Sequence, residues 1–198
     1  MKPVNIHTDG ACSGNQHKTN IGGWGAVLEY DGHEKELFGG EANTTNNRME
    51  MTALLAALRC LKKEGLHIRV FADSSYLLNC FRNKWYANWK RNNWKTTKNA
   101  PVENRDLWEE LLGFLALHSF SFFKVKGHVN PNGTEAALRS AYKKFLEQNG
   151  SGFDYDEFLH ATVMNNRADA LAGRGIAELR AGTEEGEQTQ CAAEEEKR

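Results

Sequence analysis

The sequence has no run of about 18 consecutive apolar residues, which is the length that a membrane-spanning helix requires. Its first ten residues, MKPVNIHTDG, also contain no apolar stretch of the signal-peptide kind and read as the start of a strand. We therefore expect no membrane partner and a cytoplasmic location. The chain has 198 residues, of which 40% are hydrophobic, and this is enough for one globular domain with a substantial core.

Cysteine-based architecture is missing as well. No CxxC pair and no His/Cys cluster with the spacing of zinc ligands occurs among the four cysteines, which are Cys12, Cys60, Cys80 and Cys191. We expect each to be a small, reduced side chain, and a disulfide framework is not expected.

The net charge is close to zero, at −1, and by itself favours no particular partner. The distribution of charge is more informative. Residues 82–98 contain six basic and no acidic side chains, whereas residues 183–198 contain six acidic and two basic ones. The basic stretch is a candidate for contact with a polyanion. The acidic end is poor in large apolar residues, which predicts a disordered tail over residues 181–198.

Hydrophobic periodicity and turn signals predict a mixed α/β order of elements. The expected strands are residues 3–9, 22–30, 33–39, 67–73 and 119–126, with a tight turn at Asp31-Gly32. The expected helices are one capped by Thr45 or Asn46 and stopped by Gly65, one from about Ser74, and two at 104–117 and 165–179. This order predicts a mixed five-stranded sheet, antiparallel in strands 1–3 and otherwise parallel, flanked by helices.

One domain is expected over residues 1–180. Within it, residues 130–163 form an insertion between GH at 127–128 and the last helix. Loop signals, PNG at 131–133 and NGSG at 149–152, bound its middle part. Between these loops, EAALRSAYKKFLEQ has the pattern of an amphipathic helix.

Four acidic residues stand beside apolar positions, where a globular core seldom places a charge. Asp9 and Asp73 each end an apolar strand, and Glu50 and Asp169 lie early in helices. Strand ends of such sheets gather ligands, so Asp9 and Asp73 lie close together if their strands are neighbours. Crowded carboxylates cannot all stay ionised unless a cation compensates them, and Mg²⁺ or Mn²⁺ suits oxygen ligands. Two such ions can activate water and stabilise the leaving oxygen of a phosphodiester.

Each of these acids also has an ordinary structural explanation. An isolated aspartate at a strand end is usually a cap or turn residue. A glutamate in the first turns of a helix is favoured by the helix dipole. Composition and spacing therefore identify a candidate metal site and leave both interpretations open.

Five sequence runs, in this order, resemble the motif set of type 1 ribonuclease H. They are TDGACSGN (8–15), NTTNNRME (43–50), ADSSY (72–76), VKGH (125–128) and NNRADALA (165–172). The resemblance covers roughly residues 3–129 and 164–177. It implies the ribonuclease H-like fold and an endonuclease, a phosphodiester hydrolase, that cuts the RNA strand of an RNA–DNA hybrid to leave 5′-phosphate and 3′-hydroxyl ends.

The resemblance also implies the catalytic residues. Those that ligate two Mg²⁺ ions in the presence of substrate are Asp9, Glu50, Asp73 and Asp169. Mn²⁺ can substitute for Mg²⁺, and no small-molecule cofactor beyond the metal is implied. His128 matches the family's mobile histidine, which helps proton transfer or product departure, and imidazole titrates near neutral pH. A lone loop histidine is otherwise usually a solvated residue.

Residues 82–98, RNKWYANWKRNNWKTTK, interleave basic and aromatic side chains and include three of the five tryptophans. Such a stretch can follow a phosphate backbone and stack on sugars or bases. The plainer interpretation is a helix with core tryptophans and solvated lysines, and Trp89 fits that interpretation. The stretch resembles the basic protrusion, or handle, with which the family grips the DNA strand.

Particular contacts to the hybrid follow from the same resemblance. The residues implied on the DNA side are Thr45, Trp85, Asn88, Lys90, Arg91 and Lys95. Those implied at the minor groove and the RNA 2′-hydroxyls are Asn15, Asn46 and Ser75, with the backbone near Cys12 and Gly14. Few of these groups address base edges, so we expect little sequence preference.

Two features depart from the family pattern. DSSY stands where the family has DSQY, so the shorter Ser75 side chain either uses water or leaves this contact out. The insertion puts 41 positions between His128 and Asp169, more than in compact members. Both ends of the insertion face the site. It is therefore either a lid with an extra substrate contact or a neutral surface elaboration, and the sequence leaves this open.

Two other classes of function fit part of the sequence. A catalytically silent hybrid-binding module would keep the basic stretch but lose acids, and here all four acids are present. Another nuclease of the same fold, such as a junction resolvase or an integrase core, would share the acids but lack the basic stretch and the NTTNNRME run. Nothing in the sequence requires more than a monomer.

Overall fold

The computed structural model describes residues 2–13 and 20–195, with side chains described through residue 182. Its centre is a five-stranded sheet in the order β3-β2-β1-β4-β5. The strands are β1 (Val4–Ser13), β2 (Ile21–Tyr30), β3 (His33–Ala42), β4 (His67–Ala72) and β5 (Ser119–Lys124). β2 runs antiparallel to both β1 and β3, whereas β4 runs parallel to both β1 and β5. The predicted mixed sheet is confirmed.

Six helices accompany this sheet in the described part of the chain. They are α1 (Asn46–Leu58), α2 (Ser75–Arg82), α3 (Trp85–Arg91), α4 (Arg105–Leu117), α5 (Glu135–Asn149) and α6 (Tyr155–Glu195). Thr45 and Ser74 cap α1 and α2, because their hydroxyls accept hydrogen bonds from the first-turn N–H groups. α1 ends at Leu58 and not at Gly65. The N–H groups of Cys60 and Leu61 bond to carbonyls three residues back, which tightens the chain and ends the helix early.

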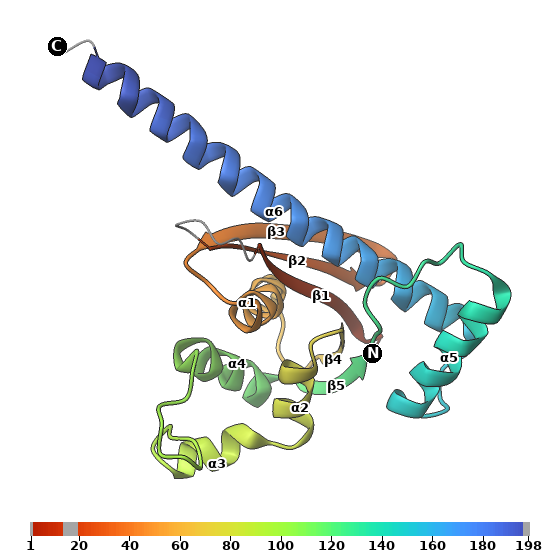
Figure 1. Ribbon diagram of the computed structural model, residues 1–198. Coiled ribbons are helices and arrows are strands. Elements are labelled where there is room, and N and C mark those ends of the chain that lie inside the picture. The colour runs from red at the N-terminus through yellow and green to blue at the C-terminus, as the bar shows by residue number, and fades with distance from the viewer. Residues whose placement is uncertain (1, 14–19, 196–198) are drawn as a thin grey trace.

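Helices cover both faces of the sheet (Figure 1). α1 packs on one face, and α6 crosses β1, β2 and β3 on the other. Successive residues of β2 show the two faces. A Cβ at Gly22 would press on Met49 of α1, whereas a Cβ at Gly23 would press on Ala172 and Ile176 of α6. Glycine at these positions therefore lets both helices lie close to the central strands.

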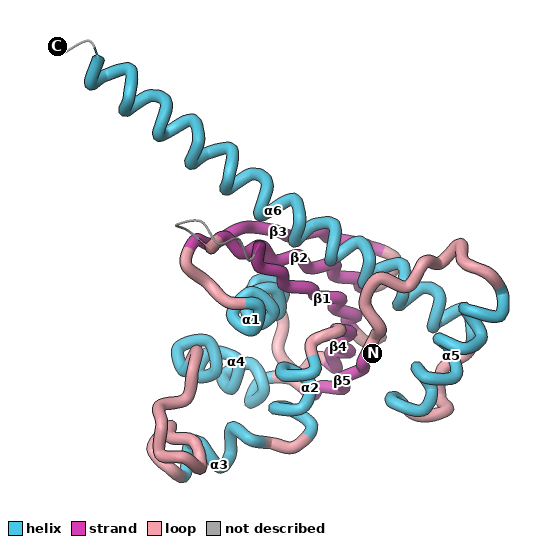
Figure 2. Tube along the Cα trace, viewed as in Figure 1, coloured by secondary structure: helices cyan, strands magenta, loops and turns pink. Residues whose placement is uncertain are grey.

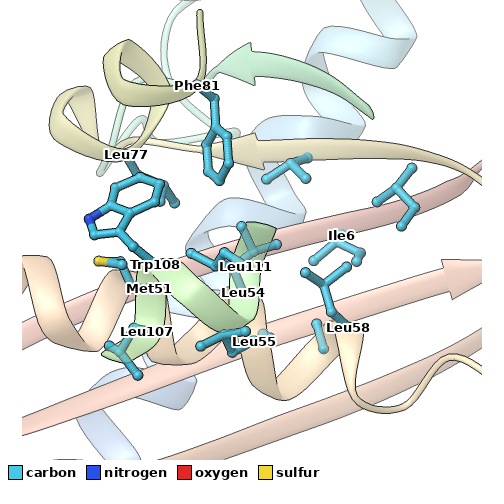
Figure 3. Packing of buried hydrophobic residues seen from close by; sticks show 14 of the residues in the cluster. Ile6, Met51, Leu54, Leu55, Leu58, Leu77, Phe81, Leu107, Trp108 and Leu111 are labelled. Carbon is cyan, nitrogen blue, oxygen red and sulfur yellow. The ribbon is translucent and has the colours of Figure 1, made fainter. Parts of the chain in front are cut away.

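The main core lies between α1, α4 and the sheet (Figure 3). Trp108 of α4 is fully buried, and its ring centroid lies 5.3 Å from that of Phe81. The Trp108 indole N–H donates a hydrogen bond to the Tyr76 hydroxyl at 3.3 Å, so its polar atom is satisfied inside the core. This packing holds α1 and α4 against the strands whose ends form the site.

The insertion at 130–163 consists of a loop, α5, a second loop and the first turns of α6 (Figure 2). Phe145, Phe153 and Phe158 pack on Phe71 of β4 in a second buried cluster. The prediction of a last helix at 165–179, separate from the insertion, is wrong, because α6 already begins at Tyr155. The Asp154 carboxylate accepts from the Glu157 N–H, and the Glu157 carboxylate accepts from the Asp154 N–H. This reciprocal cap starts the helix early.

α6 also continues further than the sequence suggested. Residues 181–198 were expected to be a disordered tail, whereas the helix extends to Glu195. Glu, Gln and Ala dominate this segment, and all three favour helix. Figure 1 shows the end of α6 projecting away from the sheet. The boundary of the domain at residue 180 stays a prediction. Among the described helices, none combines the length and the hydropathy of a membrane span.

Candidate active site

Asp9 and Asp73 stand at the same edge of the sheet. β1 and β4 are paired in parallel with Thr8 opposite Ala72, and the two aspartates are the next residue of each segment. β4 ends at Ala72, so Asp73 is the first residue beyond it. Parallel pairing therefore brings together two carboxylates that lie far apart in the sequence.

Glu50 comes to this edge from α1. A Cβ at Gly10 would collide with the backbone of Met49 and Glu50, so the glycine lets α1 approach β1 closely. One carboxylate oxygen each of Asp9, Glu50 and Asp73 then lies within 4.8 Å of the other two. These three residues form the carboxylate cluster of the site.

Two of the three carboxylates of the cluster are shielded from solvent. Asp9 and Glu50 are each only 6% exposed. Burial, followed by the charges of Asp73 and Asp169, raises the pKa of Asp9 to about 7. Burial also raises the pKa of Glu50 well above its ordinary value, with further increases from Asp9 and Asp73, and burial raises the pKa of Asp73. Without a cation, the cluster therefore retains protons near neutral pH.

The donor atoms of the cluster fit a hard divalent cation. All are carboxylate oxygens, the ligands that Mg²⁺ and Mn²⁺ prefer. The Glu50 Oε2 atom is buried and has no hydrogen-bond partner among the described residues. Such an unpaired buried oxygen is costly, and coordination of a cation would satisfy it.

Lys124 is a residue of the site that sequence reasoning missed. Its ammonium group donates to the Asp73 carbonyl oxygen and, at 3.0 Å, to the Ser75 hydroxyl. Burial lowers the pKa of Lys124, against the opposing effect of Asp73 and Glu50. Lys124 ends β5 opposite Ala72, whereas the expected strand continued to residue 126, so no sequence signal marked this position.

Asp169 and His128 lie together beside the cluster. The His128 Nδ1 atom is 3.3 Å from the Asp169 Oδ2 atom. Asp169 is not one of the three mutually close carboxylates, but its charge contributes to the raised pKa values of Asp9 and Asp73. His128 has a positive φ of 55° and a 79% exposed side chain. The histidine is therefore held at the surface of the site by its loop.

Four of the residues implied on the DNA side surround one pocket of about 620 Å³ at α3 and the loop that follows it. They are Trp85, Asn88, Arg91 and Lys95. Arg91 donates a hydrogen bond to the Asn88 side-chain oxygen. Lys90 is exposed on the same helix but does not line the pocket.

Some tryptophans of residues 82–98 fit the interpretation as core residues, and one fits the interpretation as a contact to nucleic acid. Trp94 is buried and Trp89 packs against the main core, as the plainer interpretation requires. Trp85 is 38% exposed and lines the pocket, which leaves its ring available to a ligand. The stretch therefore contains both core and surface aromatic residues.

The remaining predicted contacts are more dispersed. Thr45 and Asn46 are exposed at the start of α1, and Cys12 is half-buried near the end of β1. Ser75 is exposed and bonded to Lys124. Two predicted contacts, Gly14 and Asn15, lie outside the described residues.

The insertion borders the carboxylates through α5. A pocket of about 180 Å³ is lined by Asp73 and Gly127 on one side and by Lys144, Phe145 and Gln148 of α5 on the other. A Cβ at Gly127 would collide with the Asp73 carboxylate, so the loop before His128 also passes very close to the site. α5 thus forms part of the wall around Asp73.

Comparison with known sequences finds a matching family and several relatives of this chain. The family described as RNase H matches residues 1–145. The chain is 56% identical to ribonuclease H of Moorella thermoacetica over 128 residues, which are 65% of this chain and 82% of that protein. It is 49% identical to ribonuclease H of Chlorobium luteolum over 147 residues, which are 73% of this chain and 98% of that protein.

Solved structures show the same architecture. The crystal structure of LC9-RNase H1, described as a type 1 RNase H with the type 2 active-site motif, aligns with a TM-score of 0.56 and 27% identity over 83% of both chains. LC11-RNase H1, solved in complex with an RNA/DNA hybrid, aligns with a TM-score of 0.52 and 17% identity over 89% of this chain and 98% of that chain. The latter likeness concerns the fold alone.

Proposed function

This chain belongs to the ribonuclease H family, and from that premise we propose that it cuts the RNA strand of RNA–DNA hybrids at the carboxylate cluster of Asp9, Glu50 and Asp73. It is an enzyme of the ribonuclease H class. The finer proposal is hydrolysis with two Mg²⁺ ions that leaves 5′-phosphate and 3′-hydroxyl ends. The observation that carries it is the convergence of three carboxylates, two of them buried and that of Asp73 partly buried, from β1, α1 and the end of β4.

The residues that would hold the metal are the carboxylate cluster and, at its edge, Asp169. Bound Mg²⁺ supplies positive charge for the scissile phosphate and lowers the pKa of water, and Mn²⁺ can take its place. The Gly10 N–H donates to the Asp9 carboxylate at 2.7 Å and so orients it. Lys124 fixes the backbone of Asp73 from the other side.

His128 would move a proton at the edge of the site. Its Nδ1 atom lies 3.3 Å from the Asp169 Oδ2 atom, and this contact would orient the ring for proton transfer. Exposure of the ring lets it follow the departing product. His128 thus assists the reaction, whereas the carboxylates are required for it.

The hybrid would be held by two separate surfaces. We assign the DNA strand to the pocket of Trp85, Asn88, Arg91 and Lys95, because a cationic pocket with one exposed aromatic ring suits a phosphate and its sugar. The RNA strand is assigned to Asn15, Asn46, Ser75 and the backbone near Cys12 and Gly14, because the 2′-hydroxyl marks RNA in the minor groove. The proposal treats the protein as a cytoplasmic monomer with no small-molecule cofactor beyond the metal.

The test compares three end-labelled substrates, an RNA–DNA hybrid, an RNA duplex and a DNA duplex, each with Mg²⁺ and with EDTA. Cleavage should be confined to the RNA strand of the hybrid in Mg²⁺, and the products should carry 5′-phosphates. The Asp9→Asn variant should be inactive while keeping the circular dichroism spectrum of the parent. Equal cleavage of the three substrates, or full activity of Asp9→Asn, would contradict the proposal.

A further inference from the structure

A second group of potential metal ligands, which shares no residue with the carboxylate cluster, lies where the insertion meets the sheet. It consists of His7 of β1, Glu29 of β2 and His160 of α6, whose ligand atoms all lie within 4.8 Å of one another. Sequence spacing gave no sign of this group, because His160 stands 131 positions after Glu29. The fold alone brings these three side chains together.

Glu29 faces one imidazole with each of its carboxylate oxygens. The Nε2 atom of His7 lies 2.8 Å from Oε2, and the Nε2 atom of His160 lies 2.7 Å from Oε1. The other nitrogen of the His7 ring is buried without a hydrogen-bond partner in the part of the chain that the structure describes. The polar contact of this fully buried ring is therefore directed at Glu29.

We propose that His7, Glu29 and His160 form a binding site for one Zn²⁺ ion. Two imidazole nitrogens and one carboxylate make a ligand set that zinc sites commonly use and that Mg²⁺ does not favour. The carboxylate cluster at Asp9, by contrast, offers oxygen alone. The two sites therefore differ in the chemistry of their ligands.

The geometry needs only a small adjustment to accept the ion. Zinc–ligand bonds of about 2.0–2.1 Å place the ligand atoms of a tetrahedral site roughly 3.3 Å apart. The three ligand atoms already lie within 4.8 Å of one another, so they would have to shift by no more than about 1.5 Å to reach this spacing. His7 is held by a stacking contact with Phe71, at a ring-centroid distance of 4.7 Å, whereas the His160 side chain is 48% exposed and can move.

A fourth ligand has room to enter. A pocket of about 300 Å³ adjoins the two histidines, and Asp156 and Glu157 line it. Asp156 lies one helical turn before His160, so both can face the same ion. Glu157 is also near Arg69, with a closest nitrogen–oxygen distance of 3.7 Å, which leaves Asp156 or a water molecule as the remaining ligand.

The consequence of zinc binding is structural. The ion would fasten the first turns of α6 to β1 and β2, and the same helix carries Asp169 nine positions after His160. The fold would gain stability in proportion to zinc occupancy, independently of hybrid cleavage.

Titration of ZnCl₂ into the full-length, EDTA-stripped protein tests the site, with excess Mg²⁺ present to occupy the carboxylate cluster. Calorimetry should show one zinc equivalent, and Co²⁺ should give the visible absorption of a tetrahedral complex. At a zinc concentration of about 100 times the Kd, the melting temperature should rise by about 5–10 °C.

His160→Gln is the decisive variant, because glutamine can still donate a hydrogen bond to Glu29 but is a poor zinc ligand. It should fold as the parent does, bind zinc at least about tenfold more weakly and lose the thermal shift. His67→Gln is the matched control at an exposed histidine of β4 and should retain both. Glu29→Gln removes another of the three ligands and should also weaken zinc binding. Zinc affinity unchanged in His160→Gln, or no zinc bound by the parent, would overturn the proposal.

Discussion

Asp9 is buried with two other carboxylates, and its pKa of about 7 lies well above that of aspartate in an unfolded chain. The folded protein therefore retains a proton that the unfolded chain releases between about pH 4 and about pH 7. By linkage, this group makes the metal-free fold less stable as the pH rises through that window. A divalent cation should reverse the effect, because it stabilises the ionised cluster.

Asp9→Asn should reduce this pH dependence. In EDTA, the melting temperature of the parent should fall between about pH 5.5 and about pH 8 by more than that of the variant. Mg²⁺ should raise the melting temperature of the parent at the higher pH and have a smaller effect on the variant. Thermal unfolding followed by circular dichroism measures both quantities. The same pH dependence in both proteins would contradict the argument from burial and charge.

Lys124 contributes through the residues that it contacts. Its positive charge lowers the pKa values of Glu50 and Asp73, so Lys124→Met should raise both and keep these carboxylates protonated to higher pH. The acidic limb of the pH–rate profile should shift to higher pH, and kcat/KM at neutral pH should fall by roughly tenfold. Lys143→Met, at an exposed lysine that does not line the pocket beside Asp73, is the control. A lower rate with an unshifted profile would show that Lys124 does not act on the carboxylates.

At the scale of single residues, the features that could be predicted from the sequence are those that depend on neighbouring residues in the chain. Asp9 and Asp73 could be identified because each ends an expected apolar strand, and a cap at Thr45 or Asn46 because a helical pattern follows. The contact of Lys124 with Asp73 could not be identified from the sequence, because it depends on the pairing of β5 with β4. The approach of His160 to Glu29 depends likewise on where α6 crosses the sheet.

α3 and its following loop concentrate positive charge at a pocket with one exposed tryptophan. Replacement of Lys90, Arg91 and Lys95 by alanine should weaken hybrid binding and reduce its salt dependence. Loss of three phosphate contacts would decrease the magnitude of the slope of log K against log salt concentration by about 2–3. Fluorescence anisotropy over a series of salt concentrations measures this slope. A slope equal to that of the parent would show that this segment does not contact the phosphates of the hybrid.

α5 is the element whose role the sequence left open. Lys144 lines a pocket with Asp73, whereas the adjacent Lys143 is exposed and does not line that pocket. If α5 contacts the substrate backbone, Lys144→Glu should raise KM by up to about tenfold with a smaller effect on kcat. Lys143→Glu carries the same change of charge and should have little effect. Equal kinetics for the two variants would favour a neutral surface elaboration.

Element boundaries show where sequence signals failed. The NGSG run at 149–152 indicated a break, and Gly150 does end α5. From the sequence, the next helix was expected to begin at about residue 165. The reciprocal cap between Asp154 and Glu157 instead starts it at Tyr155. The same helix absorbs the segment expected to be a tail. Residues 153–164 had been assigned to no element, and the tail had been expected to be disordered because it is polar and poor in large apolar residues.

The architecture of the whole molecule followed from the order of its elements. Three successive strands, of which the second and third are joined by a tight turn, predicted the antiparallel half of the sheet, and strands separated by helices predicted the parallel half. The packing of the insertion on Phe71 did not follow from this order. The second cluster depends on aromatic residues from both sides of a loop, and no periodic pattern connects them. The fold was therefore predictable to the level of topology, and the surroundings of α5 were not.

The central claim is that the crowded carboxylates hold divalent cations against the RNA strand of a hybrid. The most direct test is a crystal of the protein with an uncleavable hybrid and Mn²⁺, from which anomalous scattering locates the ions. Two Mn²⁺ peaks should lie among Asp9, Glu50, Asp73 and Asp169, in contact with one RNA phosphate. Peaks confined to other parts of the molecule, or a hybrid bound away from these side chains, would contradict the account.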